Sequence, residues 1–220
     1  MNEINTQEIF DQVKAAFEKE ADLVKAPLMS KYLRNQFAFY GIQSQARKAY
    51  YKEELKILKK APLDWELVDL AWSDGHREFQ YFACDYLRAK GIELSDLAKI
   101  KKLIVAKSWW DTIDSLIKPI GMLSTQIDLS NEMLAWSKDD NFWVRRAAIE
   151  HQLTLKDQTK PDLLSQIIIN NLGSQEFFIN KAIGWALRDY SKINPDWVSQ
   201  FIETHPELSP LSKREASKYL

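Results

Sequence analysis

The sequence predicts an all-α fold, an α-solenoid of HEAT-like helical repeats. Three observations predict it: apolar residues follow helical spacing along the chain, sustained alternation of apolar and polar residues is absent, and one helical segment recurs farther along the sequence. With 220 residues, of which 45% are hydrophobic, the chain is long enough to bury a core of its own.

Helical spacing is clear from the first segment onward. Over residues 7–17, Ile9, Val13 and Phe17 lie on one face, and this spacing predicts an amphipathic helix. The same reasoning predicts helices over residues 108–118 and 177–190. Proline lacks the backbone N–H that a helix interior needs, and four prolines stand near expected helix starts or loops: Pro27, Pro62, Pro161 and Pro195.

An internal repeat is the strongest indication of the architecture. Residues 142–149 align with residues 177–184 at a constant offset of 35 positions, which pairs Phe142 with Phe177 and Arg146 with Lys181. One helical pair of this length cannot bury its apolar face alone, so we expect stacked repeats in a single domain over residues 1–220. Such a stack curves, and its concave face is expected to bind a partner. Arg146 and Lys181 should then share one face.

Several classes of function are excluded by composition. The six glycines are too scattered to form a Rossmann fingerprint or a P-loop. One cysteine, Cys84, and three widely separated histidines exclude a disulfide framework or a structural zinc site, so we expect no metal and no cofactor. The acidic first 24 residues do not resemble a signal peptide, and the apolar runs are too short to span a bilayer. We expect a cytoplasmic monomer without a membrane segment.

Charge is distributed unevenly, although the net charge is only −1. Residues 25–60 contain nine Lys and Arg against two Glu, and the flanking segments are acidic. A polyanion could bind such a basic segment. On composition alone, a solvated lysine-rich helix surface is the simpler explanation.

One constellation has the residue types for chemistry. On the helix expected over residues 108–118, Trp110 and Asp114 are four residues apart, on an edge that the apolar stripe does not use. Stacking of successive repeats would place them in a row with Arg146, Lys181 and Trp185. The alternative is structural: Trp110 packs between repeats, Asp114 pairs with a neighbouring base, and the row is an ion ladder.

At these residues the sequence closely resembles the AlkD family of DNA alkylation-repair glycosylases. The resemblance extends from about Ala26 to Tyr219. It rests on motifs that follow one another in order: NQF (35–37) after Tyr32, GIQ (41–43), SWWDTID (108–114), RAAI (146–149), KAIGWALR (181–188) and PLSKREA (210–216).

The resemblance implies a role for each matched residue. Asp114 corresponds to the catalytic carboxylate of the family, Trp110 and Trp185 to its active-site tryptophans, Arg146 to its active-site arginine and Tyr32 to its N-terminal aromatic residue. The implied reaction is excision of cationic N3- and N7-alkylpurines from duplex DNA. Such bases leave without protonation, so one carboxylate facing the oxocarbenium-like sugar is sufficient. No lysine nucleophile is evident, which predicts a monofunctional enzyme.

Contacts with the DNA backbone are expected from basic and aromatic residues that position the duplex without reading its sequence. Arg146 is expected to grip phosphate as well, and the three aromatic residues should offer exposed ring area. The expected DNA-binding residues are Tyr32, Arg34, Arg47, Lys48, Lys181, Arg188, Lys213 and Arg214. The alternative function is a noncatalytic solenoid that binds distorted or branched DNA, and a third is a protein-binding scaffold with exposed apolar anchors.

Overall fold

A computed structural model describes residues 5–220, and nearly all the regular secondary structure in this part of the chain is helical. It contains fourteen α-helices and three short 3₁₀ helices, and its β structure is limited to one isolated bridge between Ala38 and His76. The all-α prediction is therefore confirmed. The chain divides into two compact units, an N-terminal unit that ends at Ile92 and a C-terminal unit, Glu93–Leu220. The single domain expected over residues 1–220 stays a prediction.

The N-terminal unit is built around the helix α6. Phe79 and Phe82 of α6 are fully buried, and Phe79 stacks on Phe10 and contacts Phe17 of α1 at ring distances of 4.8 and 5.1 Å. Burial of Val13 and Phe17 confirms the amphipathic helix expected at residues 7–17. The helices of this unit are α1 (Thr6–Lys19), α2 (Lys25–Tyr32), α3 (Ser44–Tyr50), α4 (Lys52–Leu58), α5 (Trp65–Ser73) and α6 (Arg77–Lys90).

One buried carboxylate fixes the loop that precedes α3. Glu78 of α6 is fully buried and accepts hydrogen bonds from the backbone N–H groups of Tyr40, Gly41 and Ile42 at 2.9–3.1 Å. Gly41 has a φ of +93°, and a side chain there would collide with the backbone of Asp22. The loop therefore requires both the acid and the glycine.

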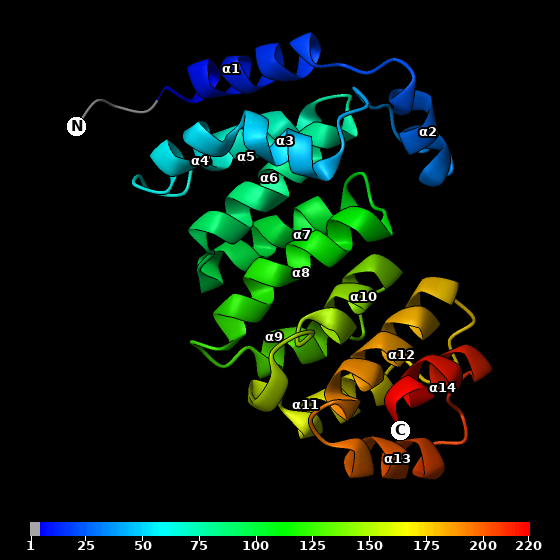
Figure 1. Ribbon diagram of the computed structural model, residues 1–220. Helices are drawn as coiled ribbons and strands as arrows, with labels where there is room; N and C mark the ends of the chain where they lie inside the picture. Colours follow the sequence, from blue (N-terminus) through cyan, green and yellow to red (C-terminus); the bar gives the residue numbers. More distant parts are fainter. Residues whose placement is uncertain (1–4) are drawn as a thin grey trace. The chain divides into compact units, whose positions relative to one another are not determined.

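The C-terminal unit consists of stacked helical pairs (Figure 1). Four helices pack on one another in chain order: α8 (Trp110–Ser124), α10 (Phe142–Glu150), α12 (Phe177–Ser191) and α14 (Pro210–Ala216). The intervening helices pack against this row: α7 (Leu97–Val105), α9 (Ser130–Trp136), α11 (Pro161–Ile169) and α13 (Pro195–Thr204). Three 3₁₀ turns complete the unit, at Leu94–Asp96, Lys156–Gln158 and Ser217–Tyr219.

The internal repeat is confirmed by this stacking. Phe142 begins α10 and Phe177 begins α12, so the two aligned segments are the equivalent first turns of neighbouring helices. The rings of Trp109, Trp143 and Phe178, which occupy matching positions at the starts of α8, α10 and α12, lie 4.8–5.9 Å apart. This aromatic ladder sets the register of the three helices, and through it the positions of the side chains one turn farther along.

Candidate functional site

Asp114 and Arg146 form the centre of the candidate site. Asp114 lies in the second turn of α8, and its side chain is 24% exposed, whereas that of Arg146 on α10 is only 1% exposed. Arg146 donates from Nε and Nη2 to Oδ1 of Asp114 at 3.1 and 2.8 Å, and from Nη1 to the carbonyl oxygen of Phe178 at 2.7 Å. One buried guanidinium thus joins α8, α10 and α12.

The burial of Arg146 corrects one expectation. Its guanidinium was expected to grip phosphate, but nearly all of the side chain lies inside the protein and its donors are used by Asp114 and Phe178. A group that is 1% exposed has no surface to offer a DNA phosphate. Arg146 instead orients the partly exposed carboxylate.

A second carboxyl group, Glu150, lies on the same guanidinium. Its Oε1 is 2.7 Å from Nη2 of Arg146, and its side chain is completely buried. Burial raises the pKa of Glu150 well above its usual value, and the charge of Asp114 and a hydrogen bond with it act in the same direction, against the opposing charges of Arg146 and Lys118. Sequence reasoning missed Glu150, although its place four residues after Arg146 was a signal.

Trp185 on α12 lies beside three cations. Its ring centroid is 5.5 Å from the guanidinium carbon of Arg146, 5.6 Å from Nζ of Lys181 and 5.9 Å from the guanidinium carbon of Arg188. The ring is half-buried, and so is that of Trp110, which begins α8 one turn before Asp114. Because Arg146 and Lys181 both approach Trp185, the prediction that they share one face is confirmed.

Glu215 of α14 holds two of these cations in place. It is 5% exposed and accepts from Lys181 at 2.8 Å, Arg188 at 3.0 Å and Lys218 at 2.9 Å. The bonds from Lys181 and Lys218 lower the pKa of Glu215 to about 2. The close packing requires Gly184, since a Cβ there would lie 2.5 Å from Cβ of Glu215. Sequence reasoning missed this anchor, which lies inside the SKREA motif.

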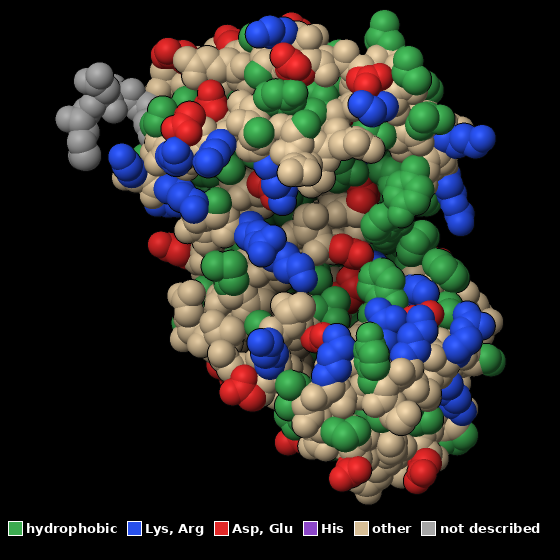
Figure 2. Space-filling model, in the orientation of Figure 1, with side chains coloured by type: hydrophobic (Ala, Val, Ile, Leu, Met, Phe, Trp, Pro, Cys, Tyr) green, Lys and Arg blue, Asp and Glu red, His purple; other side chains and the backbone are tan. Residues whose placement is uncertain are grey.

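The cations around Glu215 form a positively charged surface on the C-terminal unit. Three cations surround one carboxylate, and Figure 2 shows Lys and Arg side chains gathered over α12 and α14. Two further expected DNA-binding residues lie on α14. Arg214 is exposed, and Lys213 is half-buried with Nζ donating to the carbonyl oxygen of Pro206 at 3.1 Å.

The expected residues of the N-terminal unit differ in exposure. Tyr32, at the end of α2, is 73% exposed, and Arg34 in the following turn is exposed as well. Lys48 is 49% exposed and pairs with Asp85 at 3.5 Å. These three side chains have surface available to a partner.

Arg47 is a correction. It was expected to bind DNA, but it is 7% exposed, donates to the hydroxyl of Tyr51 at 3.4 Å and lies over the ring of Tyr81 at 4.4 Å. Its charge is matched inside the unit by Asp85. The structure therefore does not support a contact between Arg47 and DNA.

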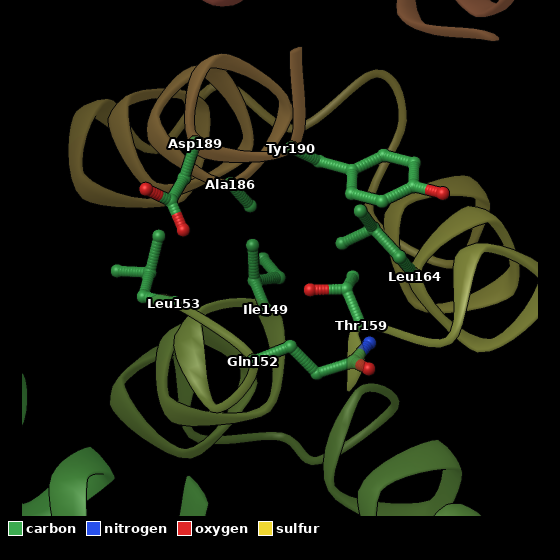
Figure 3. Close-up of a pocket in the computed structure, with 8 residues that line it drawn as sticks. All are labelled: Ile149, Gln152, Leu153, Thr159, Leu164, Ala186, Asp189 and Tyr190. Carbon is green, nitrogen blue, oxygen red and sulfur yellow. The ribbon is translucent and has the colours of Figure 1, made fainter. Parts of the chain in front are cut away.

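The enclosed pocket in Figure 3 is not part of this site. It lies among α10, α11 and α12, and its lining includes Ile149, Gln152, Leu164 and Tyr190. Its cavity volume is about 10 Å³, which is the space of about one water molecule. Over residues 5–220 no group of His, Cys, Asp and Glu has an arrangement that could hold a metal ion, and no helix is long and apolar enough to cross a membrane.

Comparisons with known proteins agree with this arrangement. Residues 13–220 match the family model described as DNA alkylation repair enzyme. The structure is similar to that of a protein from Enterococcus faecalis described as a predicted DNA alkylation repair enzyme, with a TM-score of 0.86 and 36% sequence identity over 90% of this chain and 96% of the other. No curated protein sequence gives a significant match. Because the family model matches most of this chain, the chain belongs to the DNA alkylation repair enzyme family.

Proposed function

We propose that this protein is a monofunctional DNA glycosylase that excises cationic N3- and N7-alkylated purines from duplex DNA. The observation that carries the proposal is the state of Asp114: a partly exposed carboxylate, fixed through Oδ1 by a buried arginine. A protein that binds only phosphate has no use for a carboxylate on its binding face.

The proposed reaction needs little from the protein beyond this charge. An alkylated base that already carries a positive charge leaves without a proton donor, and positive charge develops on the sugar. Asp114 stabilises that charge, and Oδ2, which accepts neither bond from Arg146, can face the sugar or the attacking water. Trp110 and Trp185 offer half-buried ring faces to the cationic nucleotide without competing charge.

Binding of the duplex is assigned to the cations with available surface. Lys181 and Arg188 flank Trp185 and are held by Glu215, so their charges are already ordered before DNA arrives. Ordered cations bind phosphate at a smaller entropic cost. The remaining proposed contacts are Tyr32, Arg34, Lys48, Lys213 and Arg214.

The test is release of free base from a duplex that carries one N7-methylguanine. We expect the wild-type protein to release it and leave an unbroken abasic strand. Asp114→Asn should slow single-turnover release by about a hundredfold to a thousandfold, because preorganised electrostatic stabilisation is worth roughly 3–4 kcal/mol. Duplex binding should change little, since the charge helps mainly after the bond begins to break.

Asp128→Asn is the matched control for this variant. Asp128 is a 70% exposed aspartate of the same unit that pairs with Lys160 at 2.7 Å, outside the site. Unchanged release by Asp114→Asn, or an equal loss in both variants, would mean that the carboxylate is wrongly assigned. Tight duplex binding without release by the wild type would favour the noncatalytic DNA-binding alternative.

A further inference from the structure

Glu150 is a buried acid that the proposed reaction leaves without a role. It lies on α10, one helical turn after Arg146, and none of its side chain is exposed. Nη2 of Arg146 is 2.8 Å from Oδ1 of Asp114 and 2.7 Å from Oε1 of Glu150. Two carboxyl groups therefore lie within 2.8 Å of a single guanidinium nitrogen.

The surroundings of Glu150 suit a neutral acid better than an anion. Neither of its oxygens accepts a hydrogen bond of acceptable geometry from the described residues, despite the short distance to Arg146. A buried anion without aligned donors is costly. The charged groups that act on it are Arg146 from its own helix and Asp114 and Lys118 from α8.

We propose that Glu150 is a positioning residue that stays a neutral carboxylic acid. Its O–H donates a hydrogen bond to the carboxylate of Asp114, and the positive charge of Arg146 is balanced by Asp114 alone. Asp114 is then held by two side chains of α10, Arg146 and Glu150, and the three side chains together carry no net charge. An ionised Glu150 would add a negative charge beneath a surface that has to accept phosphates. The benefit to catalysis rests on the function proposed above, whereas the protonation state does not.

The protonation state is tested by unfolding of the full chain in urea at several pH values. A carboxyl group whose pKa is raised in the folded state makes its full contribution to the free energy of unfolding below its ordinary pKa of 4.5. The protein loses this contribution as the pH rises through the raised value. Glu150→Gln does not titrate, so its stability relative to wild type should increase as the pH rises from about 5 to about 8.

Glu215→Gln provides a matched control of opposite sign. Glu215 is also buried beside cations, but its pKa is lowered, so Glu215→Gln should lose stability relative to wild type as the pH rises from acid through about 5. The infrared difference spectrum between wild type and Glu150→Gln at pH 7 should contain the carbonyl band of a protonated carboxylic acid. A Glu150→Gln trend like that of Glu215→Gln, or no such band, would overturn the proposal.

The positioning role is tested by comparing Glu150→Gln with Glu150→Leu in single-turnover base release. The glutamine keeps a neutral donor and should stay within about twofold of wild type at pH 7, whereas the leucine removes the donor and should be about tenfold slower. Raising the pH should slow the wild type but not Glu150→Gln. An equal loss in both variants would show that the negative charge matters, and unchanged release by Glu150→Leu would exclude positioning.

The outcome is separable from that of the proposed function. If the wild type releases no base, the proposed glycosylase reaction fails, while the unfolding trend and the infrared band still decide the protonation state. Positioning is then read from the interaction between Asp114 and Arg146 in a double-mutant cycle. Glu150→Leu should at least halve that interaction and Glu150→Gln should preserve it, and an undiminished interaction in Glu150→Leu would overturn the positioning role.

Discussion

The interaction between Asp114 and Arg146 can be measured as a coupling energy. Arg146→Met keeps much of the side-chain volume but removes the guanidinium, and Asp114→Asn removes the charge of its partner. Removing one member of a buried ion pair typically costs about 3–5 kcal/mol, and we expect Arg146→Met to fall in this range because it also leaves the carbonyl of Phe178 without its donor.

The coupling itself should be smaller. A hydrogen bond to a charged group is worth roughly 1.5–3 kcal/mol, and Arg146 makes two to Asp114. Both end on one oxygen, and the carboxylate is 24% exposed to water, so their contributions do not add fully. We expect a coupling energy of about 2 kcal/mol, roughly a 30-fold change in the unfolding equilibrium constant.

The assay is urea unfolding of wild type, both single variants and the double variant at pH 7, followed by tryptophan fluorescence. Six of the eight tryptophans lie in the C-terminal unit, so the signal reports mainly on the unit that contains the pair. A control cycle that combines Arg146→Met with Asp128→Asn should be additive within about 0.5 kcal/mol. Additivity in the Asp114 cycle as well would refute the view that Arg146 holds the carboxylate.

Two further predictions concern the supports of the fold. Gly184→Ala should destabilise the C-terminal unit by roughly 1–3 kcal/mol in urea unfolding, because the new Cβ would lie 2.5 Å from Cβ of Glu215 and α12 would have to move away from α14; an unchanged midpoint would contradict this packing. Glu78→Gln should lower the thermal midpoint of the N-terminal unit through the loss of roughly 2 kcal/mol, since three backbone N–H groups lose a charged acceptor; a midpoint equal to that of wild type would show that the charge is dispensable.

Much of the fold, and the row that contains Asp114, Arg146 and Lys181, could be predicted because an internal repeat determines where equivalent residues lie as well as which segments are helical. Once Arg146 and Lys181 are equivalent residues of stacked helices, they have to share a face, and both approach Trp185. The position of Asp114 beside Arg146 follows from the same stacking. A constant offset in the sequence thus carries three-dimensional information that helical spacing within one segment does not.

The buried acids could not be predicted in the same way. Glu150 and Glu215 are acidic residues within helices, and such residues usually face water. Their burial depends on which groups neighbouring helices bring to them, and an internal repeat does not reveal that. Arg47 was expected on the surface but is buried. A count of charges over residues 25–60 does not say which way each side chain points, and the side chain of Arg47 points inward over Tyr81.

The structure separates two tasks that sequence reasoning had assigned together to the basic residues. Arg146 is buried and orients the carboxylate of Asp114. Lys181 and Arg188 keep about a quarter of their side chains exposed and lie beside the ring of Trp185. Dissolved ions screen exposed charges strongly and buried pairs weakly. Under the proposed function, added salt therefore weakens capture of the duplex while the orientation of Asp114 persists. Added salt should therefore weaken duplex binding more than it slows base release from bound duplex, because Lys181 and Arg188 contribute to binding whereas Arg146 orients the catalytic carboxylate.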